Sequence, residues 1–430
     1  MNGNGKPAFF IKTFGCQMNR CDADLLARFF SAGGLAPADS PENSDLVHVH
    51  TCCVRQKAED KFFSLLGGIR RLKTKKPSLI VGVGGCIPEK RDLAGDFPFL
   101  DYVIGAGEIS RYADTLNEAL HRLAPHGFNV EPRTPSPVSR FIAVLRGCSN
   151  PCSYCVVPSV RGPEKSRTPE EVEAEAREMA RAGCREITIL GQNVLAYGED
   201  LAPRRTLLDV IAALHDLPGI ERLRFITSHP RWVTESFLRE LKNFPKVCEH
   251  FHVPCQSGDD EILRLMNRGY SSRDYERVVS AIREHFPPSS ITADVIVGFP
   301  GETDRRFRNT LALIQSVSPD SVYSFKYSPR PGTPAAALAD SVPAGVKNER
   351  LRLLNELQNA ISRRINDSLV GASLDVLVEE TVDPAARRYR GRTRTNKIAD
   401  FRAAAPLEPG EIATVRVLRA TPHALIGETP

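Results

Sequence analysis

The chain has 430 residues, of which 41% are hydrophobic, 25% are charged and eleven are cysteines, and its formal net charge is +5. This length predicts about two to four domains, and the composition is typical of a soluble globular protein. No run approaches the ~18 consecutive apolar residues of a membrane span, and the first residues lack the basic-then-apolar pattern of a signal peptide. We therefore expect a cytoplasmic protein whose cysteines bind metal or serve catalysis rather than form a disulfide framework.

The first segment alternates predicted strands with predicted helices. The strands are predicted over 8–13, 46–50 and 79–83, and the helices over 19–32 and 55–72. A βαβ series of this kind indicates a parallel, Rossmann-like sheet. A cysteine follows each strand, at Cys16, Cys52 and Cys86. Because ligands lie beyond the carboxyl ends of such strands, three cysteines there predict a second cluster site, although a buried cysteine is also an ordinary packed residue.

A stretch rich in proline and polar residues, over 126–139, predicts a linker. The α/β alternation then resumes. Strands are predicted over 141–145, 186–190, 223–227, 250–253, 291–297 and 321–327, with helices between them such as 169–182 and 304–316. Six βα units in a row favour a partial (β/α)6 barrel of the TIM type, whose chemistry lies at the carboxyl ends of the strands.

The first strand of this series is followed by Cys148, Cys152 and Cys155, in the spacing C-x-x-x-C-x-x-C. Three thiolates so close in sequence can hold three irons of a cubane [4Fe-4S] cluster. The fourth iron then stays open for a substrate or cofactor. A zinc site is the alternative, but zinc prefers four ligands arranged in C-x-x-C pairs. The triplet therefore predicts a cluster that takes part in chemistry rather than one that only transfers electrons.

The last part of the chain is predicted to be a long amphipathic helix followed by a small antiparallel β-barrel. Strands are predicted over 374–378, 413–417 and 423–426. Between them lies a predicted basic loop, 387–397, which contains one aromatic residue and no acid. Its six cationic residues are Arg387, Arg388, Arg390, Arg392, Arg394 and Lys397. A solvated loop is the simpler reading, but a small β-barrel carrying such a loop more often binds the phosphate backbone of a nucleic acid.

Ordered runs along nearly the whole chain carry a family resemblance. They are 13–19, 51–52 with 54–55, 85–86, the cysteine triplet with 157–158 and 161–162, 190–193, 227–230, 254 with 256–258, 297–303 and 391–393. In these runs the chain resembles the radical-SAM methylthiotransferases, and it is most similar to the branch that acts on N(6)-dimethylallyladenosine in tRNA.

The resemblance implies a domain organisation. An N-terminal methylthiotransferase domain over 7–125 would carry an auxiliary [4Fe-4S] cluster, and the linker over 126–139 would follow it. A radical-SAM domain over 140–367 would precede a TRAM domain, an OB-like RNA-binding β-barrel, over 368–430.

The resemblance also implies roles for individual residues. Cys148, Cys152 and Cys155 would hold the radical-SAM cluster, and Cys16, Cys52 and Cys86 the auxiliary cluster. The residues implied to bind S-adenosylmethionine are Tyr154, Gly191, Gln192, Asn193, Ser228, Gln256 and Asp294. Phosphate contacts are implied for the six cations of the basic loop and for Arg161, which would alternatively pair with a carboxylate near the cofactor.

The implied reaction adds a methylthio group to C-2 of N(6)-dimethylallyladenosine at position 37, next to the anticodon. It would consume two S-adenosylmethionine, one to methylate sulfur on the auxiliary cluster and one to generate the radical that takes hydrogen from C-2. The implied partners are the tRNA anticodon stem-loop and an electron donor such as flavodoxin or ferredoxin, and a monomer is expected. Two alternatives stay open: a sibling enzyme acting on threonylcarbamoyladenosine or on a ribosomal-protein aspartate, and a non-catalytic iron–sulfur RNA-binding protein.

Overall fold

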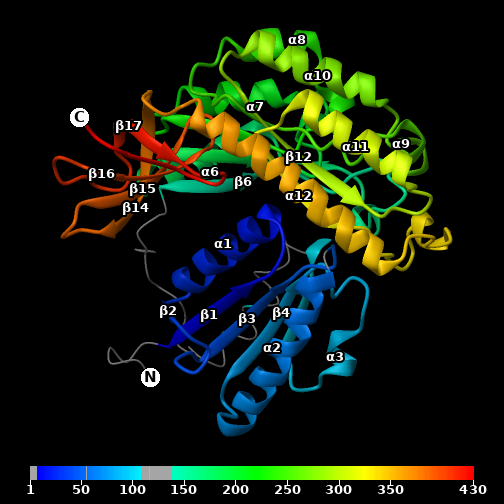
Figure 1. Ribbon diagram of the computed structural model, residues 1–430. Coiled ribbons are helices and arrows are strands. Elements are labelled where there is room, and N and C mark those ends of the chain that lie inside the picture. Colours follow the sequence, from blue (N-terminus) through cyan, green and yellow to red (C-terminus); the bar gives the residue numbers. More distant parts are fainter. Residues whose placement is uncertain (1–6, 55, 108–115, 117–137) are drawn as a thin grey trace. The chain divides into compact units, whose positions relative to one another are not determined.

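The computed structural model describes residues 7–54, 56–107, 116 and 138–430 (Figure 1). The chain divides into two compact units. Of the described residues, those from 7 to 116 form the first unit together with 147–149 and 156–163, and the second unit contains 138–146, 150–155 and 164–430. Most of the predicted linker, 126–137, lies outside the described residues, as does Arg55 at the predicted start of a helix.

The first unit contains a five-stranded parallel sheet in the order β2-β1-β3-β4-β5, as predicted for a Rossmann-like domain. Every residue of β3 and β4 is buried, as expected for central strands covered on both faces. Val47 and Val49 pack with α2, whereas Leu46 packs on the opposite face with α1. The elements are β1 (Ala8–Thr13), α1 (Gln17–Ala32), β2 (Ala36–Pro37), β3 (Leu46–Thr51), α2 (Gln56–Lys75), β4 (Ile80–Gly85), α3 (Leu93–Asp96), β5 (Tyr102–Gly105) and α5 (Val157–Arg161).

The second unit begins with six parallel strands that form two neighbouring sheets, β6-β9-β10 and β11-β12-β13. The sheets meet where the backbone N–H of Ser228 donates to the carbonyl oxygen of His252 at 3.0 Å. The order of the six strands in space therefore follows their order along the chain, as expected for the predicted partial barrel. The strands are β6 (Ser139–Ala143), β9 (Glu186–Leu190), β10 (Arg222–Ile226), β11 (His250–His252), β12 (Ser290–Val297) and β13 (Ser321–Lys326), with a short β7–β8 hairpin (Leu145–Arg146 and Lys165–Ser166) after β6.

Helices cover the outside of these strands and share one apolar core with them (Figure 1). The start of α6 shows the local cause of helix formation. Thr168 accepts a hydrogen bond from the backbone of Glu171, and the Glu171 carboxylate accepts one from the backbone of Thr168, which forms a capping box. The helices are α6 (Pro169–Arg181), η2 (Val194–Ala196), α7 (Leu207–His215), η3 (Pro230–Trp232), α8 (Glu235–Leu241), α9 (Asp260–Leu265), α10 (Ser272–His285), α11 (Asp304–Val317), η4 (Pro334–Ala337) and α12 (Ala344–Asp367), which packs on β13.

The end of the chain forms a closed five-stranded barrel in the order β14-β15-β16-β18-β17. Its strands are β14 (Ser373–Asp383), β15 (Arg388–Thr393), β16 (Ile398–Arg402), β17 (Ile412–Ala420) and β18 (Leu425–Glu428). Two expectations are corrected. The barrel is not wholly antiparallel, because β16 and β18 pair in parallel. Most of the predicted basic loop is strand β15, in which exposed or half-buried arginines alternate with the buried Tyr389, Gly391 and Thr393.

The turn between β15 and β16 anchors this barrel to the amino ends of the six parallel strands. The guanidinium of Arg222, the first residue of β10, donates to the carbonyl oxygen of Arg392 at 2.7 Å. Arg224 donates to the carbonyl oxygens of Thr393 and Arg394 at 2.8 and 2.6 Å. The Ser290 hydroxyl, at the start of β12, donates to the carbonyl oxygen of the same turn at residue 395. The carboxyl ends of the strands, where chemistry is expected, therefore stay clear of the C-terminal barrel.

Candidate functional site

The three predicted auxiliary cysteines lie in loops that follow neighbouring parallel strands. Cys16 follows β1, Cys52 follows β3 and Cys86 follows β4, and these strands are adjacent in the sheet. Gly15 shows how closely two of these loops approach. A Cβ at Gly15 would stand 2.6 Å from the Cβ of Cys52, and the φ of 117° at Gly15 lies in the left-handed region that favours glycine. The fold therefore brings these cysteine loops together at one edge of the sheet.

Asn19 ties these loops together and is fully buried. Its amide nitrogen donates to the carbonyl oxygen of Phe14 at 2.8 Å and to that of Thr51 at 2.7 Å. The same Thr51 carbonyl accepts the backbone N–H of Cys86 at 3.2 Å. One asparagine and one carbonyl oxygen thus link the loops before Cys16, Cys52 and Cys86.

A buried ion pair lies next to this asparagine. Nη2 of Arg161, in α5, donates to Oδ2 of Asp22 at 3.2 Å and to Oδ1 of Asn19 at 3.0 Å. The Arg161 and Asp22 side chains are 4% and 0% exposed. A hydrogen bond with Cys53 and the charge of Arg161 lower the pKa of the Cys86 thiol against the opposing effect of burial. Cys86 is therefore favoured as a thiolate, which is the form that binds iron.

The three auxiliary cysteines have the chemistry of iron–sulfur ligands. Around a cubane each cysteine ligates a different iron, so three cysteine loops at one edge of the sheet could hold such a cluster. The positive charge of Arg161 would offset the negative charge that a thiolate-bound cluster carries.

The loop with the last two cysteines of the triplet is pinned to the residues that end α9. The backbone N–H of Ser153 donates to the carbonyl oxygen of Met266 at 3.0 Å, and its hydroxyl donates to that of Leu265 at 2.7 Å. The side-chain amide of Asn267 donates to the carbonyl oxygen of Pro151 at 2.8 Å. These contacts fix the loop backbone without using a cysteine side chain.

A residue that sequence reasoning missed contacts the triplet directly. Nη1 of Arg268 donates to Sγ of Cys152 at 3.2 Å, and Nε donates to the hydroxyl of Tyr270 at 3.1 Å. Arg268 is 6% exposed. The hydroxyl of Tyr270 in turn donates to the carbonyl oxygen of Cys255 at 2.9 Å. Cys148 belongs to the first compact unit, where its backbone N–H donates to the carbonyl oxygen of Gly162 at 3.0 Å.

Most of the residues implied to bind S-adenosylmethionine follow the carboxyl ends of successive barrel strands. Gly191, Gln192 and Asn193 follow β9, Ser228 follows β10, Gln256 follows β11, and Asp294 lies in β12. A backbone hydrogen bond of 2.8 Å from Gln256 to the carbonyl oxygen of Asp294 joins two of these ends. Tyr154 packs against an apolar cluster with Ile262 and Met266.

Three of these residues carry buried polar atoms that have no hydrogen-bond partner among the described residues. They are Oε1 of Gln192, Nδ2 of Asn193 and Oγ of Ser228. An unpaired buried polar atom costs about 1–3 kcal/mol, so native proteins rarely keep one without a reason. A polar ligand would satisfy these atoms, and the carboxylate, amino and hydroxyl groups of S-adenosylmethionine have the required chemistry.

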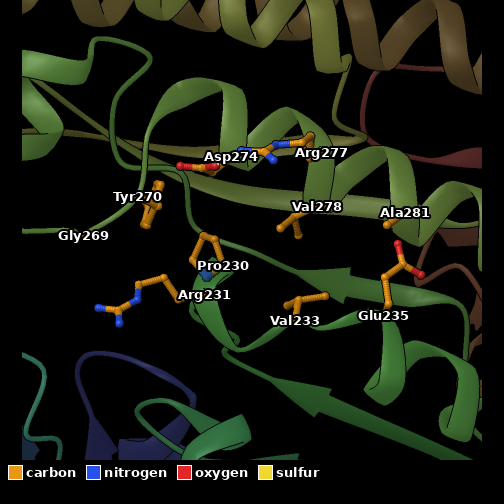
Figure 2. A pocket seen from close by; sticks show the side chains of 10 residues that line it. All are labelled: Pro230, Arg231, Val233, Glu235, Gly269, Tyr270, Asp274, Arg277, Val278 and Ala281. Atoms are coloured by element: carbon orange, nitrogen blue, oxygen red, sulfur yellow. Dashed lines mark hydrogen bonds and ion pairs between the residues drawn. The ribbon is translucent and has the colours of Figure 1, made fainter.

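A surface pocket of about 340 Å³ lies between η3 and α10 (Figure 2). Its lining comprises Pro230, Arg231, Val233, Glu235, Gly269, Tyr270, Asp274, Arg277, Val278 and Ala281. None of the residues implied to bind S-adenosylmethionine lines it. Asp274 and Arg277 form an ion pair within α10, so much of the charge at the pocket is already balanced. Tyr270 lines the pocket and also accepts a hydrogen bond from Arg268 at 3.1 Å.

The residues predicted to contact RNA fall into two groups. Arg387, Arg388 and Arg390 are exposed on the C-terminal barrel, although Arg390 pairs with Asp400 at 2.6 Å and Arg387 donates to a backbone carbonyl. Each of the remaining four residues forms an ion pair with an acid. The pairs are Arg161 with Asp22, Arg392 with Glu379 at 3.3 Å, Arg394 with Glu249 at 2.6 Å, and Lys397 with Asp320 at 2.6 Å.

The cations of the second group are held by acids rather than free in solvent. Lys397 is only 11% exposed, and its partner is an acid 77 residues away in sequence. Arg394 is paired with an acid 145 residues away, at the turn that anchors the barrel. Arg161 is buried. These three cations hold the fold together, so they are not proposed as phosphate contacts.

Weak signals for the missed residues are present in the sequence. Asn19 stands three positions after Cys16, which places both on one face at the start of a helix. Arg268 is followed by Gly269, whose φ of 67° lies in the left-handed region, and then by Tyr270. The glycine indicates a tight turn, but nothing in the sequence indicates that the Arg268 side chain contacts Cys152. Five cysteines belong to neither predicted set and are buried: Cys21, Cys53, Cys184, Cys248 and Cys255. Burial raises the pKa of Cys184 to about 11 and that of Cys255 to about 12.

Comparisons with known proteins agree with this architecture. The Radical SAM superfamily matches residues 142–314, and the uncharacterized protein family UPF0004 matches residues 8–105. Among solved structures, the radical S-adenosylmethionine methyltransferase TsrM from Kitasatospora setae is 15% identical with a TM-score of 0.53, over 76% of each chain. The cobalamin-dependent radical enzyme OxsB is 12% identical with a TM-score of 0.51, over 83% of this chain and 56% of that chain. These low identities show a shared fold alone.

Curated relatives are far more similar. The tRNA-2-methylthio-N(6)-dimethylallyladenosine synthase of Desulforamulus reducens is 40% identical over 99% of this chain and 96% of its own length. The enzyme of the same name from Clostridium botulinum is 39% identical over 98% of this chain and 96% of its own length. The chain therefore belongs to the radical SAM superfamily and, within it, to the family of tRNA-2-methylthio-N(6)-dimethylallyladenosine synthases.

Proposed function

We propose that the protein is a radical-SAM tRNA methylthiotransferase that adds a methylthio group to C-2 of N(6)-dimethylallyladenosine at position 37 of tRNA. The observation that carries the proposal is the alignment of 99% of the chain with an enzyme of that name, and the two predicted sets of three cysteines support it. A single site would supply either a radical or a sulfur, whereas this product requires both.

Cys148, Cys152 and Cys155 are proposed to hold one [4Fe-4S] cluster, and Cys16, Cys52 and Cys86 the other. When bound, these groups and S-adenosylmethionine would supply the radical and the methylated sulfur. The chain's own contribution is orientation. Asn19 and Thr51 keep the auxiliary cysteine loops in place, and the unpaired polar atoms after β9 and β10 receive the polar groups of S-adenosylmethionine.

Several finer assignments belong to the same proposal. The C-terminal barrel would contact the anticodon stem-loop through Arg387, Arg388 and Arg390, because exposed cations on a small barrel attract phosphates. A donor such as flavodoxin or ferredoxin would supply the electron, since S-adenosylmethionine does not bring one. One polypeptide carries both cysteine sites and the barrel, so a monomer would be complete. We place the enzyme in the cytoplasm; no helix in the described ranges is long and apolar enough to cross a membrane.

The proposal is tested by expressing the chain in a host that lacks its own methylthiotransferase and analysing tRNA nucleosides by mass spectrometry. We expect the 2-methylthio form of dimethylallyladenosine, and its absence when Cys148→Ala is expressed instead. A methylthio group found only on threonylcarbamoyladenosine would contradict the substrate. An active Cys148→Ala variant would contradict the role of the triplet.

A further inference from the structure

We propose that Arg268 is a positioning residue that donates a hydrogen bond to the sulfur of Cys152 and thereby raises the reduction potential of the cluster held by Cys148, Cys152 and Cys155. The inference rests on the proposed function, because it requires that the triplet holds a cluster.

The geometry around Arg268 is specific. Its guanidinium places Nη1 at 3.2 Å from Sγ of Cys152 and Nε at 3.1 Å from the hydroxyl of Tyr270, and the charged group lies 5.3 Å from the Tyr270 ring centroid. The guanidinium of Arg268 bonds to Cys152, to Tyr270 and to the Pro254 carbonyl, and among the described residues no carboxylate pairs with it. A buried arginine normally pairs with an acid. Here the sulfur of a cysteine takes the position that a carboxylate would usually have.

The backbone of the cysteine loop does not depend on this arginine. Three sets of hydrogen bonds, of 2.7 to 3.0 Å, hold the loop. Ser153 bonds to the residues that end α9, Asn267 bonds to Pro151, and the backbone N–H of Ala335 donates to the carbonyl oxygen of Ser153. Replacing the guanidinium should therefore leave the position of the loop largely unchanged. A change in the properties of the cluster would then report the lost charge and hydrogen bond.

The expected direction follows from electrostatics. One-electron reduction makes the cluster and its thiolates more negative by one charge, with the electron supplied by an external low-potential reductant. Arg268 stays protonated throughout, so no proton moves in this step. A buried cation and an N–H···S hydrogen bond stabilise the more negative, reduced state. Arg268 thus makes the cluster easier to reduce than an otherwise identical cluster without it.

The test uses the full chain with Cys16, Cys52 and Cys86 replaced by alanine, so that only the triplet can hold a cluster. The chain is reconstituted anaerobically and titrated with titanium(III) citrate, and the reduced fraction is followed by electron paramagnetic resonance. Arg268→Gln is compared with Arg264→Gln, which removes the same charge from an exposed arginine in α9. We expect Arg268→Gln to lower the ratio of reduced to oxidised cluster about tenfold at any fixed potential, a midpoint shift of about 59 mV.

Each outcome has a defined meaning. A shift for Arg268→Gln no larger than that for Arg264→Gln would overturn the inference about Arg268 while leaving the proposed function intact. Absence of iron from the parent chain that still has Arg268 would instead contradict the proposed function, because the triplet would hold no cluster. Arg268→Lys keeps the charge without the fork of donors, so its midpoint should fall between those of the parent chain and Arg268→Gln.

A second measurement does not depend on how well the Arg268 variants fold. The parent chain, grown with arginine labelled with ¹⁵N as its only labelled residue, is reduced and examined by hyperfine sublevel correlation spectroscopy. A ¹⁵N coupling to the cluster is expected from the N–H···S contact. If Arg268→Gln fails to bind iron, this spectrum decides the question, and absence of ¹⁵N coupling would overturn the inference.

Discussion

Replacing Asn19 with alanine should remove the auxiliary cluster while leaving the triplet cluster in place. The change deletes the two donors to the carbonyl oxygens of Phe14 and Thr51 and the acceptor of Arg161. The Thr51 carbonyl keeps the backbone N–H of Cys86, so the Phe14 carbonyl is the one that loses its named donor. A buried polar group left without a partner costs about 1–3 kcal/mol, which is a measurable part of the about 5–15 kcal/mol that stabilises a typical domain.

The assay is iron and sulfide analysis after anaerobic reconstitution, with chemical denaturation in parallel. We expect the iron content to fall from about eight to about four atoms per chain, because one of two four-iron clusters is lost. Asn43→Ala is the matched control: Asn43 is exposed and bonds only to Asp39, at 3.0 Å, in the pairs that the structure describes. Full iron content together with an unchanged denaturation midpoint in Asn19→Ala would refute the reasoning.

Three further predictions concern other parts of the chain. Arg224→Ala should lower the free energy of unfolding by about 3–5 kcal/mol, because it leaves the buried carboxylate of Glu186 without the guanidinium that pairs with it at 2.9 Å. Equal denaturation midpoints for the wild type and Arg224→Ala would contradict this. Burial lowers the pKa of His229 to about 3, so the folded protein keeps this side chain neutral whereas the unfolded chain protonates it as the pH falls. Between pH 6.5 and pH 5 the free energy of unfolding of the wild type should therefore fall by about 2 kcal/mol relative to that of His229→Asn, as measured by chemical denaturation at both pH values. Arg388→Ala should weaken tRNA binding and reduce its salt dependence by about one ion, whereas Lys397→Ala should lower stability with the salt dependence unchanged; filter binding at several salt concentrations distinguishes the two.

The parts of the fold that were predictable are those set by local sequence patterns. The strands before Cys16, Cys52 and Cys86 are short apolar runs followed by helical periodicity, so both the parallel sheet and the position of the cysteines at its carboxyl edge follow from βα alternation. The same holds for β9, whose bounds match the prediction of 186–190. In these cases the hydrophobic periodicity and the direction of the chain are enough to predict where each strand lies.

The parts that were not predictable depend on contacts between residues far apart in sequence. Arg394 and Lys397 looked unpaired because their segment contains no acid, but their partners lie 145 and 77 residues away. Arg268 reaches Cys152 across 116 residues. In β15 the cations concealed the alternation of exposed and buried side chains, since the buried positions are filled by a tyrosine, a glycine and a threonine.

The division of the chain between the two units has a consequence for its synthesis. The first unit recruits 156–163, so the cation that pairs with Asp22 is made more than a hundred residues after Asp22 itself. A ribosome that has released only the N-terminal sheet has released a domain whose buried Asp22 carboxylate lacks the guanidinium of Arg161. Folding of that sheet should therefore finish only after α5 has emerged, and a fragment that ends before residue 161 is not a self-sufficient module that could be transplanted to another enzyme.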